Sequence, residues 1–139
     1  MIKKISLALS LILLSATLSG CGLSPGKTAA PGEQFTLAIG ETENIRGENL
    51  KVTFKSVLED SRYPTGATCV WEGRATSQVT IVSNNTTQVE LTEPGLTASP
   101  YQYAFGNYVI FFHLEPYPEI GKQITPDQYR LTMAISKPN

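Results

Sequence analysis

The sequence is poor in the residues from which several classes of protein are built. Its 139 residues include one histidine, two cysteines and one tryptophan, and 11 basic residues nearly balance 12 acidic ones. Zinc centres draw three or four ligands mainly from His, Cys and carboxylates, so this composition argues against a metal site. A formal net charge of −1 argues against a nucleic-acid partner, which would require a concentrated basic surface. We therefore expect no metal, no cofactor and no nucleic acid.

No apolar run is long enough to span a membrane. The longest, Ile5–Leu18, covers fourteen residues, whereas a spanning helix needs about 20. Lys3 and Lys4 precede this run, and small residues follow it. A basic start, a short apolar run and small residues are typical of a secretory signal peptide, which we assign to residues 1–20.

The end of the signal peptide is more specific than an ordinary cleavage site. Residues 18–21 read Leu-Ser-Gly-Cys and resemble the bacterial lipobox. The resemblance implies that Cys21 is the lipid attachment site, becomes the new N-terminus and carries acyl chains such as palmitate. Each buried CH₂ of such a chain contributes about 0.8 kcal/mol, so several chains hold a protein on a bilayer. Gly22 stands where Asp would retain the protein on the inner membrane, which implies the outer membrane, on its periplasmic or surface face, in a diderm bacterium.

Cleavage would leave 119 residues with 9 basic and 12 acidic side chains. Residues 22–32 are almost all small, polar or Pro, a composition that predicts a flexible tether. Together with the lipidated Cys21 they form the predicted segment 21–32, whose reach is at most about 35–40 Å. The predicted folded domain spans residues 33–139.

Hydrophobic residues in this domain alternate with a period of two, which predicts strands with one buried face. The alternation occupies residues 35–39, 50–54, 79–81, 89–91 and 129–135. The segment Tyr108–Leu114 is apolar on both faces, as expected of a central strand. Turn residues at 83–86, 93–95 and 125–127 separate the strands, and no segment shows a helical stripe. The prediction is an all-β fold, a β-sandwich of 7–8 strands, Ig-like in outline, with a small β-barrel as the alternative.

The densest group of unusual residues is segment 59–73, which reads EDSRYPTGATCVWEG. It contains Asp60-Ser61-Arg62, then Pro64, and later the pattern Cys-x-Trp-x-Gly that begins at Cys69. These residues resemble a motif of small secreted and lipid-anchored bacterial proteins of uncharacterised function. The resemblance extends loosely to Leu-x-Pro-x-Pro at 114–118 and to a closing strand that begins at Tyr129.

One position departs from that motif. The family usually has a cysteine where this chain has Tyr63, so its disulfide cannot be carried over to Cys69. Because Cys21 is expected to carry lipid, Cys69 has no intramolecular partner. A buried inert thiol, an intermolecular disulfide and a reactive thiol all stay open.

The sequence contains no recognisable catalytic set. No Gly-x-Ser-x-Gly elbow is present, and His113 is expected to be a strand residue with a satisfied hydrogen bond. Glu59 and Asp60 are adjacent, so an extended strand would point them to opposite faces. Arg62 is expected to pair with Asp60 and stabilise its loop, or else to recognise a carboxylate.

These observations predict a non-enzymatic, lipid-anchored binding module with contacts on loops 62–73 or 114–126. The candidate contact residues are Arg62, Tyr63 and Trp71, because functional side chains tend to lie on loops. The expected partners are the membrane, through the anchor, and an envelope protein or polysaccharide. The alternatives are an inhibitor, a structural envelope component, or an uncharacterised hydrolase that uses Glu59, Asp60 or His113.

Overall fold

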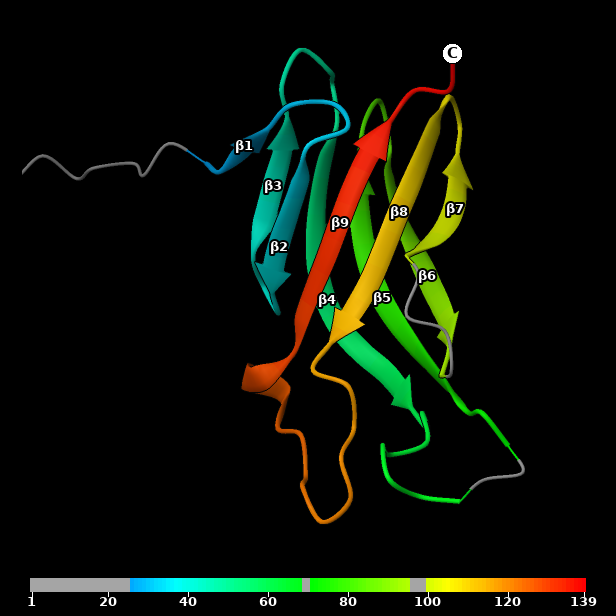
Figure 1. Cartoon of the computed structure of the whole chain (residues 1–139). Coiled ribbons are helices and arrows are strands. Elements are labelled where there is room, and N and C mark those ends of the chain that lie inside the picture. The colour runs from blue at the N-terminus through cyan, green and yellow to red at the C-terminus, as the bar shows by residue number, and fades with distance from the viewer. Residues whose placement is uncertain (1–25, 69–70, 96–99) are drawn as a thin grey trace, which may run out of the picture.

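Two stacked β-sheets make up the computed structural model, which describes residues 26–68, 71–95 and 100–139 (Figure 1). One sheet has five strands in the order β1-β3-β4-β5-β6, and the other has four in the order β2-β9-β8-β7. All neighbouring strands are antiparallel except β1 and β3, which are parallel. The strands are β1 (Thr28–Ala29), β2 (Gln34–Ala38), β3 (Thr42–Ile45), β4 (Lys51–Asp60), β5 (Arg74–Val82), β6 (Thr86–Pro94), β7 (Tyr101–Phe105), β8 (Tyr108–Glu115) and β9 (Arg130–Ser136).

The predicted all-β sandwich is confirmed, and the sheets do not close into a barrel. The described residues contain no α-helix, only a short 3₁₀ helix, η1, at Pro126–Gln128. No helix in the described ranges is long and apolar enough to cross a membrane. The predicted hairpin at residues 83–86 joins β5 to β6.

The core lies between the two sheets, as the alternating pattern requires. Inward-facing residues are buried, whereas their neighbours along each strand are half-buried or exposed. The largest fully buried side chains come from both sheets: Leu37, Phe54, Ile81, Leu91, Ile110, Leu114, Leu131, Met133 and Ile135.

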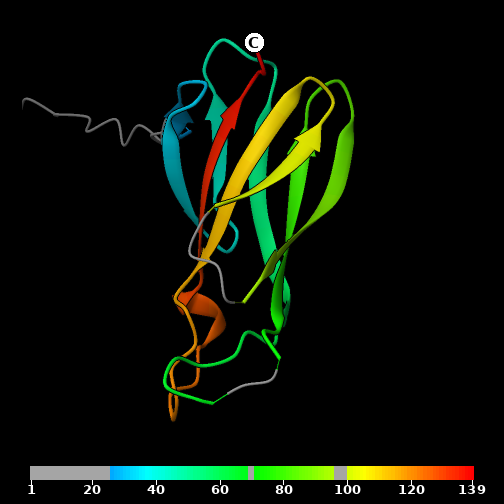
Figure 2. The same cartoon turned by 45° about the vertical axis from the view of Figure 1, so that its right-hand side comes forward.

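Strand β8 lies inside its sheet, as predicted, but it has a partner on both sides over only part of its length. On one side it pairs with β9 from Val109 to Glu115. On the other side β7 pairs with it only as far as Phe112 (Figure 2). The backbone of β8 beyond Phe112 therefore needs hydrogen-bond partners from elsewhere, because a buried N–H or C=O left unpaired is costly.

The folded domain begins earlier than the predicted boundary at residue 33. Thr28 and Ala29 pair with β3, and Ala29 is buried, so the end of the predicted tether belongs to the sandwich. Small residues suit a linker, but a short strand needs only backbone hydrogen bonds, and these leave no compositional signal. Glu93 and Pro94, predicted to lie in a turn, instead end β6. The predicted signal peptide, Cys21 and residues 22–25 lie outside the described residues, as does Cys69.

Candidate functional site

A buried arginine organises the end of the sandwich at which β4, β6 and β8 finish. Arg62 lies two residues after the end of β4, and only 3% of its surface is exposed. Its Nε and Nη2 donate to the two carboxylate oxygens of Asp60, both at 2.8 Å, in a bidentate pair. Its Nη1 donates to Glu93 Oε1 at 3.2 Å. The Arg62–Asp60 pairing expected from the sequence is thus present, and Glu93 of β6 is a second acidic partner.

The same arginine completes the part of β8 that β7 leaves unpaired. Arg62 Nη1 donates to the carbonyl oxygen of Leu114 at 2.7 Å, and Nη2 donates to that of Pro116 at 3.0 Å. The backbone N–H of Leu114 donates to the Glu93 carboxylate at 3.2 Å. The side chain of Arg62, from the loop after β4, and that of Glu93, from β6, therefore form the hydrogen bonds with Leu114 that a neighbouring strand would otherwise form. All five N–H groups of the guanidinium are used, so Arg62 has none left for a ligand.

Two tyrosines enclose this network. The Arg62 guanidinium carbon lies 5.1 Å from the centre of the Tyr117 ring, within cation–π range. The Tyr117 hydroxyl donates to the carbonyl oxygen of Gly95. Tyr129 donates its hydroxyl to Asp60 Oδ2 at 3.0 Å. Burial, with the Asp60 charge beside it, raises the pKa of Tyr129 to about 12, so this hydrogen bond persists at every physiological pH.

The network contains one positive group, the Arg62 guanidinium, and two carboxyl groups, those of Asp60 and Glu93. Burial alone would lower the pKa of Arg62, but the hydrogen bonds and charge of Asp60, with the charge of Glu93, raise it above its usual value. One guanidinium is shared between two carboxylates, and Asp60 holds it with the better geometry. Burial therefore raises the pKa of Glu93 above 4.5, although His113, Leu114 N–H and Arg62 all oppose the change.

The network also brings two loops together. Thr65 forms an isolated parallel bridge with Glu119, and its N–H donates to the Pro118 carbonyl at 3.0 Å.

Gly73 has a φ of +64°, and a Cβ there would lie 1.8 Å from the carbonyl oxygen of Ser61. Only glycine allows the two ends of loop 61–73 to approach so closely.

Residues that carry the family resemblance meet at this point, although they are distant in sequence. Each contacts Arg62, holds one of its partners or permits the loop closure beside it. They are Asp60, Arg62, Gly73, Leu114, Pro116 and Tyr129. The contacts of these motif residues are thus structural.

The three predicted contact residues differ in exposure. Arg62 is buried and fully engaged, Tyr63 is half-buried, and Trp71 is 72% exposed. Sequence reasoning missed Ile120, which is 59% exposed on the facing loop and whose Cδ1 would lie 3.6 Å from a Cβ built on Gly66. An isolated Ile in a polar loop gives no sequence signal, because its exposure depends on the fold.

The residues named for the hydrolase alternative, Glu59, Asp60 and His113, are not assembled into one acid–base set. Glu59 pairs with Arg74 at 2.9 Å, Asp60 pairs with Arg62, and His113 Nδ1 lies 3.3 Å from Glu93 Oε2. Within the described ranges no hydrogen bond joins two of the three candidates, and no group of three or more His, Cys, Asp and Glu could hold a metal. His113 is a strand residue with a hydrogen bond, as predicted.

We expect replacement of Arg62 by Met to lower the free energy of unfolding by about 3–5 kcal/mol, because two buried carboxylates lose their cation. Arg62→Lys should recover only part of this loss, since an ammonium cannot form the bidentate pair. The matched control is Arg74→Met, which removes an ion pair whose side chains are 62% and 41% exposed. Urea unfolding of all three variants tests this, and equal effects at positions 62 and 74 would contradict it.

The raised pKa of Glu93 predicts a pH dependence of stability. Because the folded state holds this proton more tightly than the unfolded chain, its contribution is complete below about pH 4.5 and is lost as the pH rises through the folded-state pKa. Wild type should therefore lose stability relative to Glu93→Gln between pH 4.5 and 7, by at most about 1.4 kcal/mol per pH unit. Urea unfolding at several pH values measures the difference.

The control for this prediction is Glu90→Gln, an exposed carboxylate in the same strand. The charged or titratable groups that face Glu93 are Arg62 and His113. Both are present in wild type and in the control variant. A constant difference between wild type and Glu93→Gln across this range would show that the carboxylate titrates alike in the folded and unfolded states.

Comparison of the chain with known protein families, with curated proteins and with solved structures finds no match. A function for this chain therefore has to follow from its own residues, above all those at the loop end formed by segments 62–73 and 114–126.

Proposed function

We propose that this protein is a lipid-anchored component of the bacterial envelope whose β-sandwich is a non-catalytic binding module. Its partner is an envelope protein, and the contact is the loop end. The observation that carries the proposal is the exposure of Trp71 and Ile120 on two loops that the Arg62 network holds together.

Large apolar side chains at such positions suit a protein interface. Trp71 is 72% exposed and Ile120 is 59% exposed, although most large apolar residues of the domain are buried. Tryptophan is enriched among the residues that contribute most to protein–protein affinity. Binding through loops already held in place loses less conformational entropy than binding through loops that must first become ordered.

The position of the loop end suits a protein anchored at Cys21. Thr28 pairs with Asn44, which pairs with Lys51 at the start of β4, so the chain enters the sandwich at that level (Figure 1). Asp60, at the other end of β4, is about 30 Å away along the strand. The six residues from Gly22 to Lys27 reach at most about 20 Å. A lipid on Cys21 would thus keep the entry side near the membrane and leave the loop end free for a partner.

The engagement of the candidate acids in ion pairs favours binding over catalysis. Asp60 and Glu93 accept hydrogen bonds from buried donors, and Glu59 pairs with Arg74. An inhibitor of an enzyme that attacks the envelope would be one form of this protein partnership.

Cys21→Ser should move the full-length protein from the membrane fraction to the soluble fraction of the bacterial cell, because the lipid can no longer be attached. The matched control is Cys69→Ser, which should leave the protein in the membrane fraction. Immunoblots of the two fractions provide the measurement. A Cys21→Ser protein that stays with the membrane would contradict the anchor.

Site-specific photocrosslinking in cells tests the loop end. A benzophenone amino acid at position 120 should yield a discrete crosslinked protein, and the additional change Trp71→Ala should reduce that product at least about tenfold. The same probe at position 103, an exposed tyrosine on β7, is the control. The loop-end assignment fails if position 120 yields no product, if position 103 yields the same one, or if Trp71→Ala changes nothing.

A further inference from the structure

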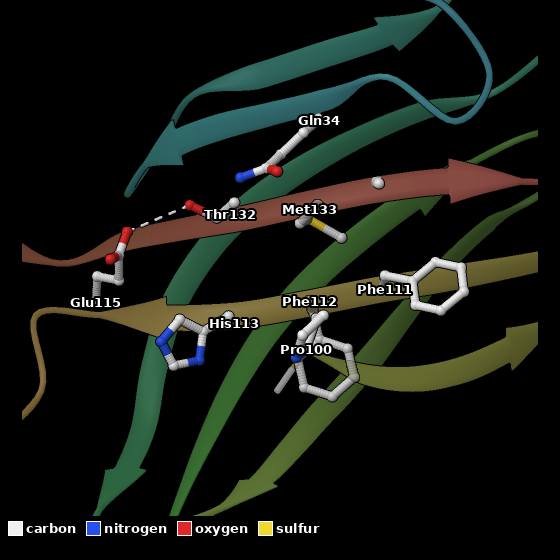
Figure 3. A pocket seen from close by; sticks show the side chains of 9 residues that line it. Gln34, Pro100, Phe111, Phe112, His113, Glu115, Thr132 and Met133 are labelled. Atoms are coloured by element: carbon white, nitrogen blue, oxygen red, sulfur yellow. Dashed lines mark hydrogen bonds between the residues drawn. The ribbon is translucent and has the colours of Figure 1, made fainter. Parts of the chain in front are cut away.

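A second surface, separate from the loop end, lies on the outer face of the four-stranded sheet. A groove of about 350 Å³ runs over β8, β9 and β2 (Figure 3). Its volume is at the lower end of the range of about 300–1,000 Å³ found for small-ligand sites. The groove combines an apolar floor with four polar side chains, which are Gln34, His113, Glu115 and Thr132.

His113 is held in one orientation by the buried network. Its Nδ1 lies 3.3 Å from Oε2 of Glu93, which is 2% exposed, whereas 28% of the His113 side chain is open to solvent. No described residue forms a hydrogen bond with Nε2, which lies on the ring edge away from Glu93. When Nδ1–H donates to the carboxylate, Nε2 accepts a hydrogen bond, and when the ring is protonated, Nε2 donates one. A hydroxyl group can satisfy Nε2 in either state.

The other polar groups suit the same chemistry. Glu115 lies two residues after His113 on the same face of β8 and accepts a hydrogen bond from Thr132 Oγ1 at 3.4 Å (Figure 3). Its carboxylate has further lone pairs for hydroxyl donors. Gln34, exposed on β2, offers both an amide donor and an acceptor.

The apolar part of the groove suits a ligand that has C–H surface in addition to hydroxyl groups. Phe111 and Pro100 line it beside the polar groups and offer surface for C–H groups. Phe111, His113 and Glu115 alternate along β8, so they share one face over about 13 Å. This length suits a disaccharide better than a single ring.

The charge of the lining selects among such ligands. No lysine or arginine lines the groove among the described residues, and Glu115 contributes a carboxylate. An anionic ligand would therefore meet repulsion without compensation. From these observations we propose that the groove is a binding site for a neutral saccharide of about two rings, with His113, Glu115 and Gln34 as its hydrogen-bonding residues.

The test is titration of the ¹⁵N-labelled domain with cellobiose and with N,N′-diacetylchitobiose, followed by two-dimensional NMR. At least one should shift the resonances of residues 34, 111–115 and 132, with a Kd on the order of 1 mM. Digalacturonate, the anionic counterpart, should bind at least about tenfold more weakly. No shifts with either neutral disaccharide, shifts confined to segments 62–73 and 117–125, or equal binding of digalacturonate would overturn the proposal.

Variants decide whether the named side chains carry the binding. Glu115→Gln removes a charged acceptor and Gln34→Ala removes an amide, both at exposed strand positions, and each should weaken binding about tenfold. Glu90→Gln, an exposed carboxylate on the other sheet, should leave the Kd unchanged. Unaltered affinity in both groove variants would overturn the assignment. This outcome is independent of the loop-end proposal, which rests on the exposed side chains of Trp71 and Ile120.

Discussion

The contact between the Arg62 guanidinium and the unpaired end of β8 is the interaction on which the loop end depends. β7 stops pairing at Phe112, and beyond it the backbone of Leu114 and Pro116 is paired by side chains. A buried ion pair by itself is weak evidence for stability, because desolvation offsets its Coulombic attraction. Here the guanidinium also satisfies the buried carbonyl of Leu114, so removing it leaves that carbonyl and two buried carboxylates without their donor at once.

This contact relates the motif in the sequence to the shape of the loops. Asp60 holds the Arg62 guanidinium along one edge, and the ring of Tyr117 covers the face of the guanidinium. Gly73 then allows loop 61–73 to close over Ser61. Among the described residues the restraint on this loop is ionic and aromatic.

The period-two pattern was sufficient to predict the long strands, because each buries one face in a shared core. It did not predict β3, whose inward residues are Glu43 and Ile45 and so do not form an apolar alternation. It could not predict β1, whose two residues pair through the backbone alone. The Arg62–Asp60 pair was within reach of the sequence, since the two residues are two apart. The role of Glu93 could not be predicted from the sequence. Its neighbour Pro94 indicated a turn, and its contacts with Arg62 and His113 join residues that are distant in sequence.

The most direct measurement is native-state hydrogen exchange of the Leu114 amide. If the Glu93 side chain pairs it as a neighbouring strand would, this amide should exchange only through global unfolding, with a free energy equal to that of Leu131, a core residue in β9. If Leu114 exchanges through local opening, as an amide at an unprotected sheet edge does, then Arg62 and Glu93 do not complete the edge of β8.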